Sequence, residues 1–148
     1  MERKANKSLK RIIKKILVFW LPVVIWLTVI FAFSSRPTKV TSEIYWQDFV
    51  VKKLAHIIEY GILTVLIYRA LVNSNVEKKE AGFYSIILSL MYGVSDEFHQ
   101  RFVPGRMPTV RDVFFDIIGA VLAIYFILGY LPRASEGLKN WAKKVQIH

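Results

Sequence analysis

Four apolar stretches separated by polar connections set the pattern of this sequence. Residues 16–33 contain no charged residue, and residues 113–131 contain only Asp116. Residues 54–72 and 83–94 are also apolar, although polar residues interrupt the former and directly follow the latter. A helix that crosses the hydrocarbon core of a bilayer needs about 20 mostly apolar residues. The pattern therefore predicts four membrane-spanning helices.

The first apolar stretch has a second interpretation, a cleaved signal peptide. Ala32-Phe33-Ser34 resembles a small-x-small cleavage site. The charge-free run of residues 16–33 is, however, longer than the usual signal-peptide core of about 7–15 residues. Pro22 lies near its start, where helices in lipid tolerate proline. We therefore favour an uncleaved membrane anchor.

Composition and charge support the membrane interpretation. The chain has 148 residues, enough for one domain, and 54% of them are hydrophobic. A soluble core of this size could not bury so much apolar surface, so part of it must face lipid. The absence of cysteine excludes disulfides and thiolate chemistry. The net charge is +10, and the charged residues flank the apolar stretches. This favours contact with anionic lipid headgroups over binding of nucleic acid.

The basic residues are unevenly distributed around the apolar stretches. If the N-terminus lies inside, the inner segments hold 14 Lys and Arg residues and the outer connections hold seven. Cytoplasmic loops of membrane proteins carry the excess of Lys and Arg. The sequence therefore predicts an all-α fold, a polytopic integral membrane four-helix bundle with N- and C-termini in the cytoplasm.

This topology divides the chain into three parts. Residues 1–15 are a basic cytoplasmic segment, residues 16–131 the transmembrane domain, and residues 132–148 a basic cytoplasmic tail. One helical face of the tail carries Leu138, Trp141 and Val145. This is typical of a short helix lying on the inner membrane surface. A solvated tail is the alternative.

Two connections carry further signals. Residues 34–52 are expected to be a polar connection whose aromatic side chains lie at the membrane interface, namely Tyr45, Trp46 and Phe49. Pro104-Gly105 predicts a tight turn between the third and fourth helices. Gly119 predicts a close approach between two helices.

Helix length brings polar residues of all four helices to one level. Residues 83–94 would span only about 18 Å, so the third helix must continue to about Phe102 to cross a core of roughly 30 Å. Counting back from the inner ends of the second and fourth helices places their polar residues in the outer half as well. The residues expected at this level are Ser34, Ser35, Arg36, Lys53, His56, Glu59, Asp96, Glu97, His99, Gln100, Asp112 and Asp116.

Ionisable groups in a bilayer cost about 2.5–3.5 kcal/mol each, so they suggest a functional site. Their helical spacing supports this, because three sets each share one helix face: His56 with Glu59, Asp96 with His99 and Gln100, and Asp112 with Asp116.

Structural roles remain the alternative for each set. His56 and Glu59 could hydrogen-bond between helices. Asp112 could complete a capping box with Thr109. The two deepest acids, Glu59 and Asp116, need compensation, which we expect from an outer cation: Lys53, Arg106 or Arg111.

Several of these residues form motifs that resemble the VanZ-like membrane proteins. In chain order they are Phe33-Ser34-Ser35-Arg36-Pro37, Lys53-x-x-His56-x-x-Glu59-Tyr60-Gly61, Asp96-Glu97-Phe98-His99-Gln100, Phe102-Val103-Pro104-Gly105-Arg106, and Asp112 with Asp116 and Gly119-Ala120. The resemblance covers residues 33–120. Two positions depart from the family pattern. At position 36, where this chain has Arg36, Gln is commoner in the family, and at position 116, where this chain has Asp116, Asn is commoner.

The resemblance implies a multi-pass protein of the bacterial cell membrane. The family is named after an accessory protein of glycopeptide resistance clusters that raises tolerance to teicoplanin. The resemblance implies no established reaction, so whether this chain is an enzyme stays open.

Three functions fit the polar residues. In the first, the protein binds an anionic lipid or lipid-linked envelope precursor through Arg36, Lys53, Gln100, Arg106, Arg111, Asp112 and Asp116. Arginine suits this role because its planar fork binds phosphate or carboxylate through two hydrogen bonds. In another, the chain is an accessory subunit of an envelope complex and the polar cluster has a structural role only.

The remaining function is that of a membrane enzyme that acts on a lipid-linked or peptidoglycan-related substrate. The candidate acid–base residues are His56, Glu59, Asp96, Glu97 and His99. A metal-assisted version would draw ligands from three helices, as carboxylate bundles do. The chain has no HExxH motif or nucleophile elbow, and we predict no metal and no cofactor.

Overall fold

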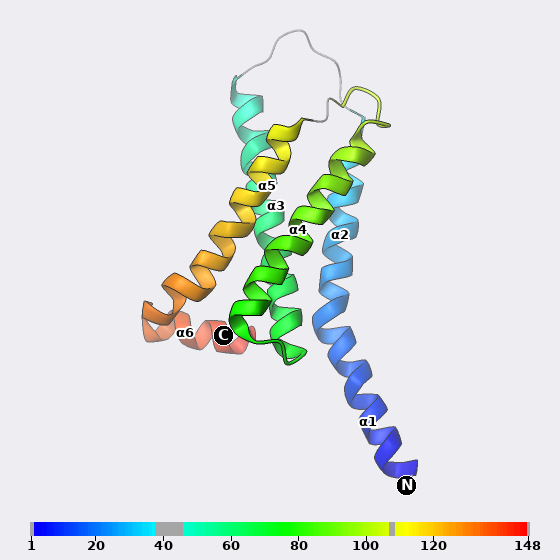
Figure 1. Cartoon of the computed structure of the whole chain (residues 1–148), viewed down its shortest axis with the longest axis vertical. Coiled ribbons are helices and arrows are strands. Elements are labelled where there is room, and N and C mark those ends of the chain that lie inside the picture. The colour runs from blue at the N-terminus through cyan, green and yellow to red at the C-terminus, as the bar shows by residue number, and fades with distance from the viewer. Residues whose placement is uncertain (1, 38–45, 107–108, 148) are drawn as a thin grey trace.

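The protein is an all-helical bundle. The structure, a computed structural model, describes residues 2–37, 46–106 and 109–147 (Figure 1). Regular secondary structure in these ranges is entirely helical, which confirms the predicted all-α class. The elements are α1 (Glu2–Lys15), η1 (Ile16–Trp20), α2 (Leu21–Ser34), α3 (Trp46–Asn73), α4 (Lys78–Gln100), α5 (Val110–Ile124), η2 (Tyr125–Tyr130), η3 (Leu131–Arg133) and α6 (Glu136–Lys144).

Four long helices, α2, α3, α4 and α5, run side by side (Figure 1). Helix α3 contacts the other three, and its packing against α5 is the most extensive. At one end of the bundle α2 and α4 end while α3 and α5 begin; we call this the distal end (top of Figure 1). The opposite, proximal end carries both chain termini, with α6 lying across it (Figure 1).

Helix α3 begins earlier than the sequence suggested. Residues 34–52 were expected to be a connection, but α3 starts at Trp46. The charges of Lys52 and Lys53 interrupt the apolar run without interrupting the helix, because Lys53 forms an ion pair with Asp112 of α5. The expected interfacial residue Tyr45 lies outside the described residues, whereas Trp46 is 71% exposed.

Helix α4 ends at Gln100, two residues before the expected end near Phe102. A turn then closes with a 3.1 Å hydrogen bond from Arg106 N to Val103 O. Gly105 has a φ of 77°, so Pro104 and Gly105 occupy the central positions of a type II turn. The predicted turn is confirmed, and it holds Arg106 at its last position.

Helices α3 and α5 approach at the level of Gly119. A Cβ atom on Gly119 would lie only 2.2 Å from the Ile57 carbonyl oxygen, so no larger residue fits without a backbone shift. Gly61, one turn further along α3, faces the Gly119 carbonyl at 3.4 Å from its own ideal Cβ. The close approach predicted at Gly119 is confirmed, and it fixes how α5 is aligned against α3.

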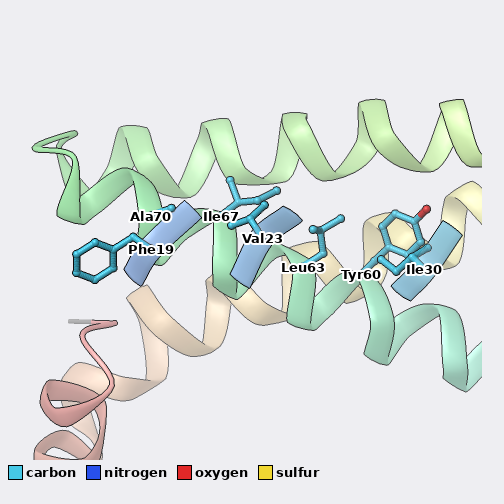
Figure 2. Close-up of a cluster of buried hydrophobic side chains, with 7 residues drawn as sticks. All are labelled: Phe19, Val23, Ile30, Tyr60, Leu63, Ile67 and Ala70. Atoms are coloured by element: carbon cyan, nitrogen blue, oxygen red, sulfur yellow. The ribbon is translucent and has the colours of Figure 1, made fainter. Parts of the chain in front are cut away.

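The main hydrophobic cluster lies between the first long helix and α3. Figure 2 shows its members, Phe19, Val23, Ile30, Tyr60, Leu63, Ile67 and Ala70. A second cluster, formed by Tyr68, Ala81, Ile124 and Ile127, joins α3, α4 and α5 nearer the proximal end. These clusters fill the lower and middle bundle and leave the distal end to polar side chains.

Pro22 shapes the first long helix. Proline has no N–H, so it cannot donate to Val18 O, its partner in a regular α-helix. The five residues of η1 that precede it are π-helical, with Leu21 N donating to Ile16 O. Val18 O accepts a 3.2 Å hydrogen bond from Arg69 Nη1 of α3. The irregular turn therefore provides a contact between two helices.

Two continuous helices are long and apolar enough to cross a membrane, Leu9–Ser34 and Val110–Arg133. Only 11% of the most apolar window of the first, and 22% of that of the second, is buried within the protein. A core helix of a soluble protein would be mostly buried, so these faces are compatible with lipid. Helices α3 and α4 have 28 and 23 residues and would also be long enough, but they carry more polar residues.

Candidate functional site

Polar side chains from α3, α4, α5 and the α4–α5 turn meet at the distal end. Five of them are buried, with at most 9% of their surface exposed: Asp96, Glu97, Gln100, Asp112 and Asp116. Together with the half-buried Lys53, His56, Glu59, His99 and Arg106 they form what we call the distal polar layer. The sequence placed all ten of these residues among the candidate site residues.

His56 and Asp116 form a largely buried pair between α3 and α5. His56 Nδ1 lies 2.8 Å from Asp116 Oδ1, and the Asp116 side chain is only 2% exposed. Gly93 of α4 leaves room for this carboxylate, because a Cβ there would lie 3.0 Å from Asp116 Oδ2. We expected an outer cation beside Asp116, but its partner is His56. The carboxylate fixes the imidazole orientation and leaves Nε2 without a hydrogen bond among the described residues.

Asp112 pairs with Lys53, and this changes how α5 begins. Thr109 is the N-cap of α5, yet its side chain makes no capping hydrogen bond. Its backbone N–H donates instead to Glu97 Oε2 of α4 at 2.9 Å. The alternative role of Asp112, a capping box with Thr109, is therefore not found. Glu97 accepts the Thr109 N–H bond instead, and Asp112 forms an ion pair with Lys53.

Asp96 and Gln100 share a face of α4, as their spacing predicted. Gln100 Nε2 donates to Asp96 Oδ2 at 2.9 Å. The other oxygen, Asp96 Oδ1, is buried without a hydrogen-bond partner in the described part of the chain, and so are Glu97 Oε1 and Ser34 Oγ. Buried acceptors without donors cost free energy, so they mark a place where a ligand with donors would be stabilised.

The Glu59 carboxylate lies among these groups but forms no hydrogen bond with a described residue. Glu59 is half-buried on α3. Asp96, Asp116 and Arg106 lie close enough to Glu59 to act on it electrostatically. The cation we expected beside Glu59 is thus near it, but not bound to it.

Arg106 connects the α4–α5 turn to the end of α2. Its Nη2 donates to Phe33 O at 2.8 Å and its Nε donates to Arg36 O at 3.3 Å. These carbonyls lie at the C-terminal end of α2, where the helix dipole favours a cation. Arg36 itself stacks over Phe33, with Cζ 4.9 Å from the ring centre. Arg111 is exposed and makes no hydrogen bond or ion pair with any described residue.

His99 faces α2 rather than the other candidate acids and bases. Its Nε2 lies 3.1 Å from Ser35 Oγ, and that hydroxyl donates to Phe31 O at 2.7 Å. The single hydroxyl proton is thus used, so His99 Nε2–H is the donor of the pair. Nδ1 of His99 remains as an acceptor.

A groove of about 290 Å³ runs beside His99 between α2 and α4. Its walls are formed by Phe31, Tyr92, Ser95, Asp96, Phe98, His99 and Phe102. The groove therefore combines aromatic rings with a carboxylate and an imidazole. None of its aromatic residues was among the predicted site residues, although Tyr92 shares one face of α4 with Ser95, Asp96 and His99 by helical spacing.

The candidate metal ligands are not brought together. The described residues contain no group of three or more His, Asp or Glu side chains that could hold a metal ion. His56 is bound to Asp116, while Asp96 and His99 turn to partners on other faces of the layer. The geometry therefore gives no support to the metal-assisted version of the enzyme hypothesis.

These features define a class: small all-helical proteins with lipid-compatible helices and a buried polar layer at one end. Residues 18–131 match the family model described as VanZ/LLP1, and the chain belongs to this family. The match confirms the resemblance to the VanZ-like proteins. Comparison with curated proteins and with solved structures gave no match.

Proposed function

We propose that the chain is a multi-pass protein of the bacterial cell membrane, with four spans and both termini in the cytoplasm. Three observations support this: the apolar faces of the long helices, the 14-to-7 distribution of Lys and Arg, and the family. Helices α3 and α4 would be about 42 and 35 Å long, enough to cross beside α2 and α5. The distal polar layer then lies at the outer leaflet.

Cysteine labelling tests this orientation, and the chain has no native cysteine to interfere. We expect Pro104→Cys, in the exposed distal turn, to react with an impermeant thiol reagent in intact cells. Lys79→Cys, exposed at the proximal end, should react only after the membrane is opened. The reverse pattern would place the distal layer in the cytoplasm.

We further propose that the distal end binds the headgroup of an anionic lipid or lipid-linked envelope precursor. The observation that carries this is the groove beside His99, whose aromatic walls lead to buried acceptors. Arg106 binds the carbonyl of Phe33 near the end of α2, so a cation lies at the same end of the bundle as the groove.

The charges restrict the ligand. The acids of the interior, Glu59, Asp96, Glu97, Asp112 and Asp116, outnumber the cations Lys53 and Arg106 among the described residues of the layer. A phosphate or carboxylate is therefore bound at the rim, by Arg36, Arg106 and Arg111. The interior fits hydroxyl, amide or ammonium groups of the same headgroup, which can donate to Asp96 Oδ1 and Glu97 Oε1.

Mass spectrometry of lipids that co-purify with the full chain tests the binding. Arg106→Ala should lose the co-purified species, and Arg106→Lys should keep part of it, since lysine keeps the charge but not the planar fork. Arg101→Ala is the control for loss of a cation at the same end, because the Arg101 side chain forms no ion pair with a described residue and packs over the Phe98 ring, with Cζ 5.8 Å from the ring centre. Equal lipid content in all variants would contradict the proposal.

Acid–base catalysis on such a ligand is the second candidate, favoured by the His56–Asp116 pair. A carboxylate on Nδ1 with Nε2 left open is the arrangement of a general base. If the chain is an enzyme, His56→Gln should keep or accumulate the bound lipid, whereas a binding protein should bind it less. We also propose that the chain contributes to teicoplanin tolerance, which the resemblance to the VanZ-like proteins suggests, and we expect a chain with Arg106→Ala to confer less of it than the parent.

A further inference from the structure

A second cavity lies at the proximal end, away from the distal polar layer. It has a volume of about 520 Å³ and lies between the start of α4, the η2–η3 segment and α6. Its apolar side is formed by residues that include Ile127, Leu128 and Leu131. Residues of α6 form part of its wall, and Figure 1 shows α6 lying across this end of the bundle.

Four lysines line the same cavity: Lys78, Lys79, Lys139 and Lys143. They come from two elements far apart in sequence, the first turn of α4 and helix α6. Glu77 is the one acid among its lining residues. Lys139 binds the exposed Glu136 at 3.0 Å, while the other three lysines make no hydrogen bond or ion pair within the described ranges. The cavity is thus strongly positive.

Helix α4 adds to this potential. Its N-cap, Glu77, lines the cavity and makes no side-chain capping hydrogen bond, so the first N–H groups of this 23-residue helix have no side-chain cap. The N-terminus of a helix favours an anion through these groups and through the helix dipole.

Tyr68 supplies an independent indication of a ligand. Its side chain lines the cavity and is fully buried, yet its hydroxyl has no hydrogen-bond partner among the described residues. A buried hydroxyl normally has a partner. A phosphate oxygen in the cavity would accept from it.

We propose that the proximal cavity binds a phospholipid with an anionic phosphate headgroup. The lysines and the start of α4 hold the phosphate, and the apolar side receives the glycerol and the upper acyl chains. Exposed aromatic side chains at this end, Tyr130 at 54% and Trp141 at 50%, are of the kind that lies at the membrane interface. Basic pockets between helices on this side of a membrane suit such headgroups. This site does not depend on the ligand of the distal layer.

Titration of phosphatidylglycerol into the full chain in phosphatidylcholine-containing micelles tests the proposal, with the apparent Kd as the readout. Lys143 and Lys144 are neighbours on α6, but only Lys143 lines the cavity. We expect Lys143→Gln and Lys78→Gln each to weaken binding about fivefold, as expected for one lysine near anionic lipid. Lys144→Gln should leave the Kd unchanged. Tyr68→Phe keeps every charge and should still weaken binding severalfold.

Three results would overturn the proposal. Equal losses in Lys143→Gln and Lys144→Gln would mean diffuse attraction to the basic surface. No preference for phosphatidylglycerol over phosphatidylcholine would remove the anionic ligand. Glycerol 1-phosphate that binds as tightly as phosphatidylglycerol would show that the cavity takes a soluble phosphate ester and not a lipid.

Discussion

The two ends of the bundle satisfy their polar groups in different ways, although Arg106 at the distal end also donates to main-chain carbonyls. At the proximal end, cations donate to main-chain carbonyls: Arg69 Nε binds Val145 O at 2.8 Å, and Lys15 Nζ binds Asn73 O at 3.1 Å. At the distal end, side chains of one helix bind side chains of another, as in Lys53–Asp112 and His56–Asp116. The proximal contacts tie helix ends together, and no acid described at this end is buried.

The distal end, in contrast, holds more buried polar groups than its own contacts require. Asp96 Oδ1 and Glu97 Oε1 remain buried without donors among the described residues, and Glu59 has no bond to any of them. A bundle held together only for stability would not need these groups, since apolar residues of similar size would serve as well. The difference is that the distal layer keeps buried acceptors for which the described residues supply no donor, whereas the proximal contacts of Lys15 and Arg69 belong to the fold itself.

Replacement of Gly119 should have the largest effect. Gly119→Ala puts a Cβ against the Ile57 carbonyl and must move α5, which separates Asp112 and Asp116 from their α3 partners. We expect a loss of about 3 kcal/mol in unfolding free energy, the upper end for overpacking. Gly137→Ala in proximal α6 is the control, because its Cβ would meet nothing within 4 Å. Melting temperatures in detergent compare the two; equal values would contradict the close contact.

Replacements of two acids of the distal layer should affect stability differently. Asp116→Asn removes the charge that His56 faces, so we expect a loss of about 1–3 kcal/mol in stability. Glu59→Gln removes a carboxylate that makes no hydrogen bond with the described residues, so the melting temperature should stay equal or rise. If Glu59→Gln destabilises the protein as much as Asp116→Asn, Glu59 is a structural partner and the contrast between the ends is weaker.

The ion pairs of the two ends should couple differently. In a double-mutant cycle with Lys53→Met and Asp112→Asn, we expect a coupling energy of about 0.5–3 kcal/mol, because both side chains are largely shielded from solvent. The same cycle on Lys139 and Glu136 of α6 should give no measurable coupling, since the Glu136 side chain is 78% exposed. Similar values at both ends would contradict the contrast.

The smallest effect concerns Glu136. The hydrogen bond and the charge of Lys139 lower the pKa of the Glu136 carboxyl from its ordinary value of 4.5. The pair's contribution is therefore present above the unfolded-state pKa and is lost as pH falls through the folded-state pKa. NMR titration of labelled glutamates should show this low pKa, and Lys139→Gln should raise it. The melting temperature should not change with pH between about 5 and 7 on account of this pair.

Much of the fold follows from the sequence. The apolar stretches predicted the long helices, and Pro104-Gly105 and Gly119 predicted a turn and a close contact that the structure contains. The start of α3 was predicted wrongly because Lys52 and Lys53 look like a loop until Asp112, 59 residues after Lys53, is placed beside them. A helix end that depends on a distant partner cannot be read from local composition.

The candidate site was predicted as a set of residues but not as a set of pairs. Helical spacing groups residues of one helix, so it suggested His56 with Glu59 and Thr109 with Asp112. The bonds that form cross between helices, His56 to Asp116 and Thr109 N–H to Glu97. Which residues pair depends on how α5 is aligned against α3 at the close contact of Gly119. The spacing of residues along one helix carries no information about this alignment.

Pro22 has a consequence for how the protein is made. Ribosomes deliver Val18 to the membrane well before Arg69, the side chain that donates to its carbonyl. In the proposed topology the first span therefore enters lipid with an acceptor that the proline cannot serve. Folding is then ordered by synthesis: the first helix stays free to rotate, and its arrival at a fixed orientation awaits the emergence of α3.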